Sequence, residues 1–465
     1  MNIGFSKIDI TPPLGTRMAG QPMNYVAKGV ESRLFATSMC LSHGSERIVL
    51  VSCDLVMLSN ETISEITAKA EKQFSIPAES IILCVTHTHS GPITQAIFGM
   101  DADDSYLKQL NSNILLSIEL SLKNCVPAEF YFTKAQLDGF AFNRRFIMSD
   151  GNIETHPLKG DPHIVKSEGP DSNDLSVFYA CDINDVPLGA IVVFGCHATV
   201  MERDNELISS DYAGKVARYV SDKLGQNVPV LFLQGASGNI CQVNPMDKSK
   251  REVGLGWTEV MGKAVGQKAI DVLNSKKKKA SGSLRIFTET IEIPRRSVDP
   301  EILRWAKNYK DIDCEMPVLS DYGVEHFDEI KPPKVSLEQL FKTPYWANFY
   351  ANEIRTLDKD KKKQPQMPLV IKVIAQDNWA MVTLPCELFV EWSEKIYAKS
   401  PFEYTTVVEL ANGWNGYIPT KVAFERKGGY ETKDVTSTML VPEAGEMVLK
   451  TVLDMLNEAK KSVNC

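Results

Sequence analysis

The stretch SIILCVTHTHSGP, residues 80–92, decides the fold. Its apolar run from Ile81 to Val85 shows no alternation of polar and apolar residues, which predicts a strand buried on both faces. The run ends at His87 and His89, and a Ser-Gly-Pro turn follows. The same arrangement returns in GAIVVFGCH, residues 189–197, where a second predicted strand ends at His197. The sequence therefore places three imidazoles just beyond the carboxyl ends of core strands.

Further apolar runs predict more buried strands, and amphipathic stretches lie between them. Residues 61–74 carry the three- and four-residue spacing of a helix. Because strands that are apolar throughout need both sheet faces covered, we expect an α/β fold with mixed, largely buried β-sheets covered by helices. The additional predicted strands are residues 47–53, 228–233, 379–384 and 405–410.

The composition narrows the class of protein. Of 465 residues, 43% are hydrophobic and 24% are charged, which is ordinary for a globular protein with a sizeable core. The formal net charge of -8 argues against a nucleic-acid partner, which would require a basic surface. Residues 1–13 lack the basic and apolar regions of a secretory signal, and no apolar run is long enough to cross a bilayer. We therefore expect a cytoplasmic protein without a transmembrane segment, and the sequence leaves its oligomeric state open.

Some segments are predicted to lie outside the core. Residues 149–174 are rich in Gly, Pro and Asp, and such long irregular stretches often form the rims of binding sites. The lysine-rich residues 275–279 and 358–363 predict solvated surface rather than binding patches.

The strand ends carry the candidate metal ligands. Ligands of open α/β sheets bind beyond the carboxyl ends of the strands, where His87 and His197 stand. Glu387 and Tyr417 end two further predicted strands or follow them closely. A catalytic zinc site needs a few N and O ligands and one open position, which these four residues would supply. Such ligands would also accept Mn or Fe. A strand-end histidine is, taken singly, more often a structural residue, so the residues alone leave both interpretations open.

Several strings in this order resemble the neutral/alkaline non-lysosomal ceramidase family. The most specific is THTHSGP at 86–92, after a strand that ends in Val-Ser-Cys-Asp at 51–54. The resemblance covers essentially the whole chain, with a poor match between about residues 295 and 368. It implies one catalytic domain of the ceramidase type over residues 1–465, with a variable insertion near 295–368. The other strings are GFSKIDIT at 4–11, NR at 143–144, GCHAT at 195–199, LPCE at 384–387 and NGWNGY at 412–417.

The resemblance also implies roles for seven residues. It assigns His89 and Arg144 to the substrate side, near the scissile carbonyl, and likens Tyr430 to the family's second active-site tyrosine. A metal would make hydroxide available near neutral pH, His89 would shuttle a proton to the leaving amine, and Arg144 would hold a polar substrate group. The residues that match the family's zinc ligands are His87, His197, Glu387 and Tyr417.

Two departures from the family pattern bear on the substrate. The family's Gly-Asp-x-Ser-Pro-Asn turn, whose serine contacts the lipid head group, is replaced here by a longer turn over residues 235–245, with Asn239 at the Asp position and Cys241 near the Ser position. We also expect the protein to lack the secretory leader and the C-terminal immunoglobulin-like domain that lipid-cleaving members of the family carry. We therefore expect a small-molecule or lipid-like N-acyl substrate, with a smaller polar amide favoured over ceramide.

Other interpretations remain open. The Gly-x-Ser-Gly pattern around Ser237 could be taken for a serine hydrolase, but it lacks the second half of a nucleophile elbow. A TIM-barrel amidohydrolase also uses an HxH pair, although that pair follows its first strand, and the spare His156 and His163 here lie in a loop. A zinc-dependent ester or lactone hydrolase on the same fold, and a non-catalytic binding protein that retains the fold, complete the alternatives.

Overall fold

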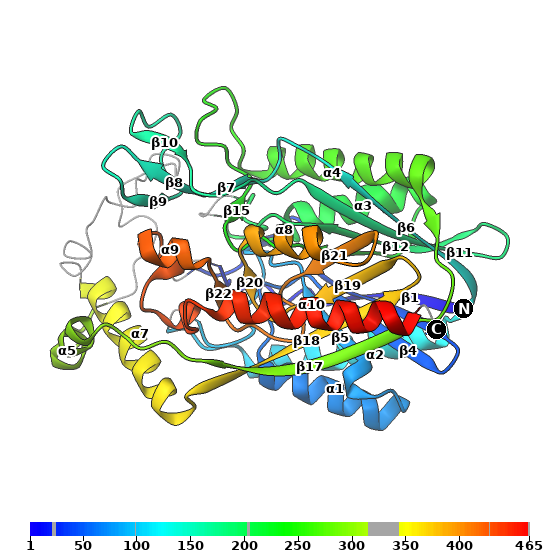
Figure 1. Ribbon diagram of the computed structural model, residues 1–465, viewed down its shortest axis with the longest axis horizontal. Helices are drawn as coiled ribbons and strands as arrows, with labels where there is room; N and C mark the ends of the chain where they lie inside the picture. Colours follow the sequence, from blue (N-terminus) through cyan, green and yellow to red (C-terminus); the bar gives the residue numbers. More distant parts are fainter. Residues whose placement is uncertain (21–24, 98, 202–204, 315–343, 427, 464–465) are drawn as a thin grey trace.

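The computed structural model describes residues 1–20, 25–97, 99–201, 205–314, 344–426 and 428–463 (Figure 1). Within these residues the largest sheet has nine strands, and most neighbouring pairs are antiparallel. The short strand β16 (Lys278–Lys279) pairs with β6 beside the main path. That path runs β14 (Val230–Gln234), β12 (Pro187–Phe194), β11 (Asp174–Asp182), β6 (Val126–Gln136), β1 (Asn2–Asp9), β3 (Phe35–His43), β4 (Glu46–Cys53) and β5 (Ile81–Val85).

The large sheet curls so that its two edges approach each other. The edge strand β14 lies against β3, β4 and β5 at the opposite end of the strand order. The Ser52 hydroxyl on β4 donates a hydrogen bond to the carbonyl of Phe232 on β14. Two pairs near these edges, β4–β5 and β12–β14, are parallel. The curl therefore brings the carboxyl ends of β5 and β12 toward the same place.

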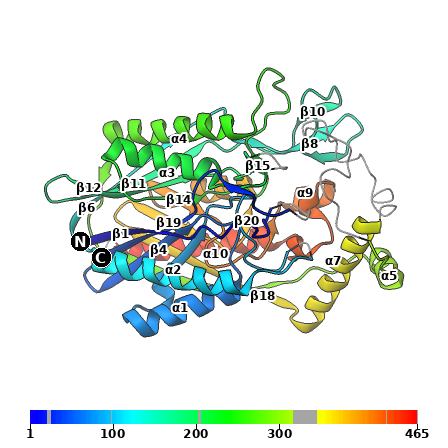
Figure 2. The ribbon, with the colours of Figure 1, turned by 180° about the vertical axis from the view of Figure 1, so that it is seen from behind.

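Two pairs of helices cover the outer face of this sheet. Helices α1 (Asn60–Phe74) and α2 (Asp104–Lys123) pack along β1, β3 and β4, whereas α3 (Asp211–Leu224) and α4 (Leu255–Lys276) pack along β6, β11, β12 and β14. Figures 1 and 2 show these pairs on opposite sides of the strands. On β4, Ile48 and Leu50 face the inner core, whereas Val49 and Val51 face the helices. This explains why the strand is apolar throughout, as predicted.

Helix α1 illustrates how local sequence sets the boundaries of an element. The Ser59 side chain accepts a hydrogen bond from the Thr62 backbone N–H, which satisfies a free donor of the first turn. Buried Ile63, Ile66 and Ala70 follow at helical spacing, and Ser75 ends the helix in the left-handed conformation with φ of 54°. The predicted helix over 61–74 is confirmed.

A second sheet fills the inside of the curl. Its four strands run β17 (Arg285–Pro294), β18 (Gln366–Gln376), β19 (Trp379–Thr383) and β21 (Tyr404–Val408), and the β19–β21 pair is parallel. Trp379 packs with its ring centroid 5.2 Å from that of Phe178 and 5.8 Å from that of Phe130, both on the large sheet. Helices α8 (Val390–Lys399) and α10 (Ala444–Val463) cover the opposite face. The predicted α/β architecture of buried mixed sheets under helices is confirmed.

Short elements surround the strand ends. The pairs are β2 (Gly29–Val30) with β13 (Leu207–Ile208), β7 (Phe142–Asn143) with β15 (Ile240–Cys241), and β20 (Glu387–Leu388) with β22 (Tyr417–Ile418). The remaining turns and helices are η1 (Ala78–Ser80), α9 (Lys421–Arg426), η4 (Tyr430–Thr432) and η5 (Thr436–Thr438).

The prediction that residues 149–174 are irregular is partly wrong. They contain β9 (Ile153–Thr155) and β10 (Ile164–Ser167), which flank β8 (Arg145–Met148) in a three-stranded sheet. These strands are too short to produce a recognisable period in the sequence, and pairing with β8 stabilises them. A bridge from Ile153 to Gly428 connects this small sheet to the segment that carries Tyr430.

The predicted insertion near residues 295–368 is described only in part, since 315–343 lie outside the described residues. The described part holds α5 (Pro300–Asn308) and α7 (Pro344–Lys363), which contact each other. Figure 1 shows both at the end of the molecule opposite the start of β1 and the end of α10. Among the described residues, no helix combines the length and the apolar character that a membrane crossing requires.

The packing of β1 on α2 yields a stability prediction. A Cβ atom added at Gly4 would lie 2.2 Å from the Ser121 carbonyl oxygen and 2.6 Å from the Cys125 backbone nitrogen. We expect Gly4→Ala to lower the free energy of unfolding by about 1–3 kcal/mol, because backbone must move to admit the methyl group. Gly256 in α4 is the matched control: its added Cβ meets no atom within 4 Å. Gly256→Ala should be neutral or stabilising by about 0.4–1 kcal/mol. Urea denaturation measures both, and equal midpoints would contradict this account of the packing.

Candidate metal centre

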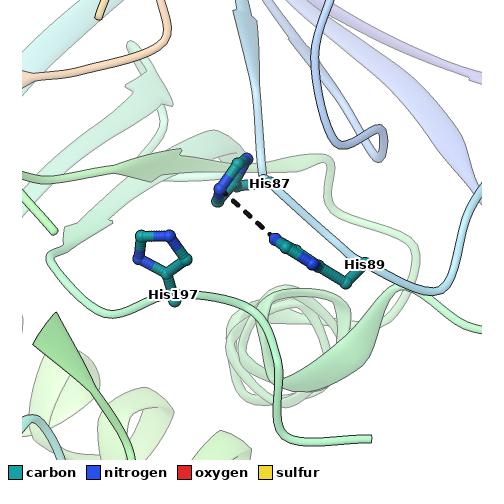
Figure 3. Close-up of side chains that lie close together, drawn as sticks. All are labelled: His87, His89 and His197. Atoms are coloured by element: carbon teal, nitrogen blue, oxygen red, sulfur yellow. Dashed lines mark hydrogen bonds between the residues drawn. The ribbon is translucent and has the colours of Figure 1, made fainter. Parts of the chain in front are cut away.

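The three histidines predicted at strand ends meet where the large sheet closes (Figure 3). His87 follows β5 in the left-handed conformation, with φ of 64°, and its backbone N–H donates to the Leu55 carbonyl. This conformation is costly for a residue with a side chain and is retained where the surroundings hold it. The His89 backbone N–H donates to the Ala198 carbonyl, which ties the segment after β5 to the segment after β12.

Backbone carbonyls fix the orientation of all three imidazoles. The Nδ1 atom lies 2.7 Å from the Val56 carbonyl oxygen in His87, 3.0 Å from that of Gly20 in His89, and 2.7 Å from that of Ser237 in His197. Because a carbonyl oxygen only accepts, each Nδ1 must carry the hydrogen. In the neutral ring the lone pair is then on Nε2, and this tautomer is the one that a histidine ligating a metal through Nε2 adopts.

The Nε2 lone pairs converge on a carboxylate. The Glu387 Oε2 atom lies 3.1 Å from the Nε2 of His197 and 3.4 Å from the Nε2 of His87. A tetrahedral zinc ion with bonds of roughly 2.0–2.1 Å holds its ligand atoms about 3.3 Å apart. His89 is close as well, with its Nε2 3.4 Å from that of His87. The ligand atoms of the three histidines all lie within 4.8 Å of one another. The donors therefore fit a single metal ion.

The electrostatics of the cluster favour a cation. Burial lowers the pKa of His197 to about 4, with the charge of Arg144 as a further cause. Burial, together with the neighbouring His87 and His197, holds the pKa of His89 well below its usual range. Neither ring is therefore protonated near neutral pH, and the Nε2 of His197 faces the Glu387 carboxylate while that of His89 faces the Nε2 of His87. Such an arrangement is repulsive unless a positive ion lies among the donors.

Glu387 and Tyr417 come from the short pair β20–β22, whose strands follow β19 and β21 of the second sheet along the chain. They are register partners in the parallel pair β20–β22, so their side chains leave the backbone side by side. The second carboxylate oxygen of Glu387, Oε1, accepts a hydrogen bond from the Trp414 indole N–H at 2.8 Å. Trp414 lies within one of the family strings, but no role was predicted for it from the sequence. Its indole holds the carboxylate so that Oε2 faces the histidines.

Arg144 connects the metal donors with the outer part of the site. One of its terminal nitrogens, Nη2, lies 3.3 Å from the Tyr417 hydroxyl and donates to the Gly238 carbonyl at 2.7 Å. Its Nε donates to Glu431 Oε1 at 3.0 Å. Burial opposes the charge of Arg144, yet Tyr430, Tyr417 and Glu431 together raise its pKa above the usual value. The guanidinium is therefore a fixed positive charge beside Tyr417.

Tyr430 stands at the outer edge of the group and is 36% exposed. Its ring centroid lies 6.0 Å from that of Tyr417 and 5.1 Å from the guanidinium carbon of Arg144. The seven predicted residues thus form one continuous group: His87, His89, His197 and Glu387 at the centre, then Tyr417 and Arg144, then Tyr430.

Glu431, the carboxylate that holds Arg144, is not among the residues predicted from the sequence. Glu431 is fully buried, and its two oxygens bind Arg144 and Arg145. Thr155 in the small sheet donates to the same carboxylate at 2.9 Å. The signal available in the sequence was its place directly after Tyr430, next to two consecutive glycines.

Ser237 is not arranged as a nucleophile. Its hydroxyl donates to Glu409 Oε1 at 2.5 Å and accepts from the Gln234 side-chain amide at 2.8 Å. His197 bonds to the Ser237 carbonyl, not to its hydroxyl. The pairing of hydroxyl and imidazole that a serine hydrolase requires is therefore not formed at this residue.

A family-wide sequence profile, described as "Neutral/alkaline non-lysosomal ceramidase, N-terminal", matches residues 1–254. Among curated proteins, neutral ceramidase A of Dictyostelium discoideum is 28% identical over 233 residues, which cover 48% of this chain and 32% of that protein. The neutral ceramidase of Pseudomonas aeruginosa is 26% identical over 297 residues, covering 58% of this chain and 42% of that protein. The matches thus span less than half of the length of these relatives.

The fold has a counterpart among solved structures. The crystal structure of the Pseudomonas aeruginosa neutral ceramidase superposes with a TM-score of 0.72 at 18% sequence identity. The superposition covers 99% of this chain and 75% of that one. It therefore extends well beyond residue 254, where the profile match ends.

Removal of the central histidines tests whether this cluster binds a metal. We expect His87→Ala and His197→Ala each to lose stoichiometric metal. The loss of metal affinity should exceed the roughly 10–100-fold loss that follows removal of a hydrogen bond supporting a metal ligand. His163→Ala is the matched control, because His163 lies outside the cluster and bonds to the Ser149 hydroxyl. Elemental analysis of the purified variants measures the effect. Retention of one zinc per chain in the His87/His197 double variant would refute the centre.

Proposed function

The chain belongs to the neutral/alkaline non-lysosomal ceramidase family, and from this we propose that it is a metal-dependent hydrolase that cleaves the amide bond of an N-acyl substrate. The observation that carries the proposal is the convergence of two buried imidazole lone pairs on the Glu387 carboxylate, at distances of 3.1 and 3.4 Å. A purely structural polar cluster would pair donors with acceptors, whereas this one gathers acceptors.

We assign the metal to His87, His197, Glu387 and Tyr417, and we propose zinc as the ion. When bound, zinc lowers the pKa of a coordinated water to near 7 and polarises a carbonyl group. The protein holds these donors ready by the backbone bonds to the imidazoles and by the Trp414 bond to Glu387. Tyr417 enters from the side of Arg144, whose charge favours a polarised hydroxyl there.

His89 is the residue we propose for proton transfer. Its ring is held by the Gly20 carbonyl, and its Nε2 faces the metal donors without a hydrogen of its own. Because burial keeps its pKa low, His89 is neutral at pH 7 and can accept a proton. The same nitrogen can then deliver the proton to the leaving amine, which must be protonated to depart.

Arg144 and Tyr430 are proposed to contact the substrate. A guanidinium fixed by Glu431 and the Gly238 carbonyl cannot follow a moving ligand, so it sets where a polar group of the substrate lies. Charge that develops on the carbonyl oxygen would be stabilised by this preorganised donor. Tyr430 is partly exposed above Arg144 and is placed to pack on the substrate as it enters.

The turn over residues 235–245 supports a substrate other than ceramide. Asn239 is almost fully buried, and its side chain accepts from the Val390 backbone N–H and donates to Glu391. Cys241 is also buried, with its thiol 3.7 Å from the Val243 carbonyl oxygen. Both side chains are thus engaged within the protein. We propose a smaller polar N-acyl amide as the substrate class.

A substrate panel tests this function. Zinc-loaded protein should hydrolyse short N-acyl amides of polar amines with a higher kcat/KM than ceramide, and chelator-treated protein should be inactive until zinc returns. Ester isosteres of the same acyl groups form the comparison arm. Cleavage of esters alone would contradict amide hydrolysis as the function. A folded protein that binds no metal would contradict metal dependence altogether.

The role of His89 is tested separately. We expect His89→Gln to keep one metal per chain and to lower kcat by about 10²–10⁴-fold, the usual contribution of a general acid–base residue. Metal content and steady-state kinetics are measured on the same preparation. A parallel loss of metal and activity would instead make His89 a metal ligand, as its place within 4.8 Å of the other two histidines allows.

A further inference from the structure

Glu409 is a buried carboxylic acid near His197 and Glu387, two of the proposed metal ligands. It directly follows β21, and it is fully inaccessible to solvent. Its carboxyl group accepts hydrogen bonds from a hydroxyl and from a backbone N–H, those of Ser237 and Leu388. Burial of a carboxyl group among neutral partners is costly, so its retention calls for a reason.

One oxygen of Glu409 reaches the segment that orients His197. Its Oε1 accepts from the Ser237 hydroxyl at 2.5 Å. The carbonyl of the same serine accepts from His197 Nδ1 at 2.7 Å. Displacement of Ser237 would therefore turn the imidazole, because this carbonyl sets the direction of Nε2.

The other oxygen reaches the segment that carries Glu387. Its Oε2 accepts from the Leu388 backbone N–H at 2.7 Å. Leu388 is adjacent to Glu387 within β20, so this bond fixes the short strand from which the carboxylate projects. One buried side chain thus holds the backbone behind two metal donors that belong to different sheets.

Gln234, at the end of β14, bonds to both Glu409 and Ser237 and so stabilises their contact. The Glu409 backbone N–H donates to the Gln234 carbonyl at 2.9 Å, and the Gln234 amide donates to the Ser237 hydroxyl at 2.8 Å. The same amide also donates to the carbonyl of Cys196, the residue before His197. The Tyr212 hydroxyl donates to that carbonyl at 2.6 Å. The network therefore joins the ends of β12, β14 and β21.

We propose that Glu409 is a positioning residue that sets the separation of His197 and Glu387, acting through Ser237 and the Leu388 backbone. The inference rests on the proposed metal-dependent function, because it concerns the geometry of those donors. Glu409 itself contacts neither the metal nor the substrate. Its removal should widen or misalign the donor set and leave the rest of the fold in place.

The variants differ in how many of these bonds they retain. Glu409→Leu removes both. Glu409→Gln retains them, since its carbonyl can accept from Leu388 and its amide can donate to the Ser237 hydroxyl. Ser237→Ala removes the hydroxyl but leaves the carbonyl that bonds His197. Ser117→Ala is the control for loss of a buried hydroxyl: Ser117 bonds to Ser6 and Ser38 between α2 and the large sheet.

Cobalt(II) serves as the probe, because its visible absorption reports the coordination geometry as well as the affinity. We expect Glu409→Leu to weaken cobalt binding by about 10–100-fold and to change the spectrum. Glu409→Gln should resemble the wild type, and Ser117→Ala should bind cobalt normally whatever its melting temperature. In the Glu409→Leu/Ser237→Ala double variant the losses should not add, because both changes break one connection.

Other outcomes would overturn the proposal. Unchanged affinity and spectrum in Glu409→Leu, or an equal loss in Ser117→Ala, would reduce Glu409 to a structural residue. Equal losses in Glu409→Gln and Glu409→Leu would exclude positioning through these two bonds. If Glu409→Leu does not fold, Ser237→Ala becomes the test. Normal cobalt binding by Ser237→Ala would contradict positioning of His197 by Glu409 through Ser237. A wild-type protein that binds no cobalt would refute the metal centre itself, a result distinct from the failure of Glu409 alone.

Discussion

The structure depends on the burial of several hydrogen-bond acceptors that face one another. The Nε2 atoms of His197 and His87 lie 3.1 and 3.4 Å from one oxygen of Glu387, in a site almost closed to solvent. Left to themselves these groups would repel one another and turn away. Each is prevented from doing so by a bond at its far side: the Val56 carbonyl behind His87, the Ser237 carbonyl behind His197 and the Trp414 indole behind Glu387. The protein thus holds these groups in an arrangement that could bind a cation at its centre.

The fold brings these groups together where the large sheet and the inner sheet lie next to each other. The large sheet contributes the histidines, because its curl brings the ends of β5 and β12 together, and the short pair β20–β22, whose strands follow β19 and β21 of the inner sheet, carries Glu387 and Tyr417. Close approach of the two backbones requires a residue without a side chain at Gly238. Its N–H donates to the Leu388 carbonyl, and an added Cβ would lie 2.6 Å from the Glu387 carbonyl oxygen. Glu409 bonds to Ser237 and to the Leu388 backbone at the same place. The separation of the two backbones and the direction of the side chains are therefore held by different bonds.

The centre of the site gathers hydrogen-bond acceptors, whereas the groups around it include two buried arginines. Two consecutive arginines, Arg144 and Arg145, are buried beside the donors, and Glu431 neutralises part of their charge through both of its oxygens. Because the carboxylate fixes the guanidinium of Arg144, the positive group facing Tyr417 and Tyr430 is preorganised and not drawn from flexible surface lysines. The small sheet that forms within residues 149–174 supports this outer wall, since Thr155 binds Glu431 and Ile153 pairs with Gly428. Part of this predicted rim therefore adjoins the segment that carries Tyr430 and Glu431.

The sequence by itself determined the buried strands, the helix over 61–74 and the place of His87, His89 and His197 at strand ends, because apolar runs and their punctuation are local signals. The family strings also indicated Glu387, Tyr417 and Arg144, and a separate likeness to the family indicated Tyr430. Only the tertiary structure revealed Trp414, Glu431 and Glu409 as supports, since each acts on a residue that the fold, not the chain, places beside it. A buried polar residue belongs to no repeating pattern in the sequence, so the sequence does not indicate which residue it bonds. The two short strands within 149–174 escaped notice for a related reason: their stability comes from pairing with β8, an interaction that leaves no pattern in so few residues.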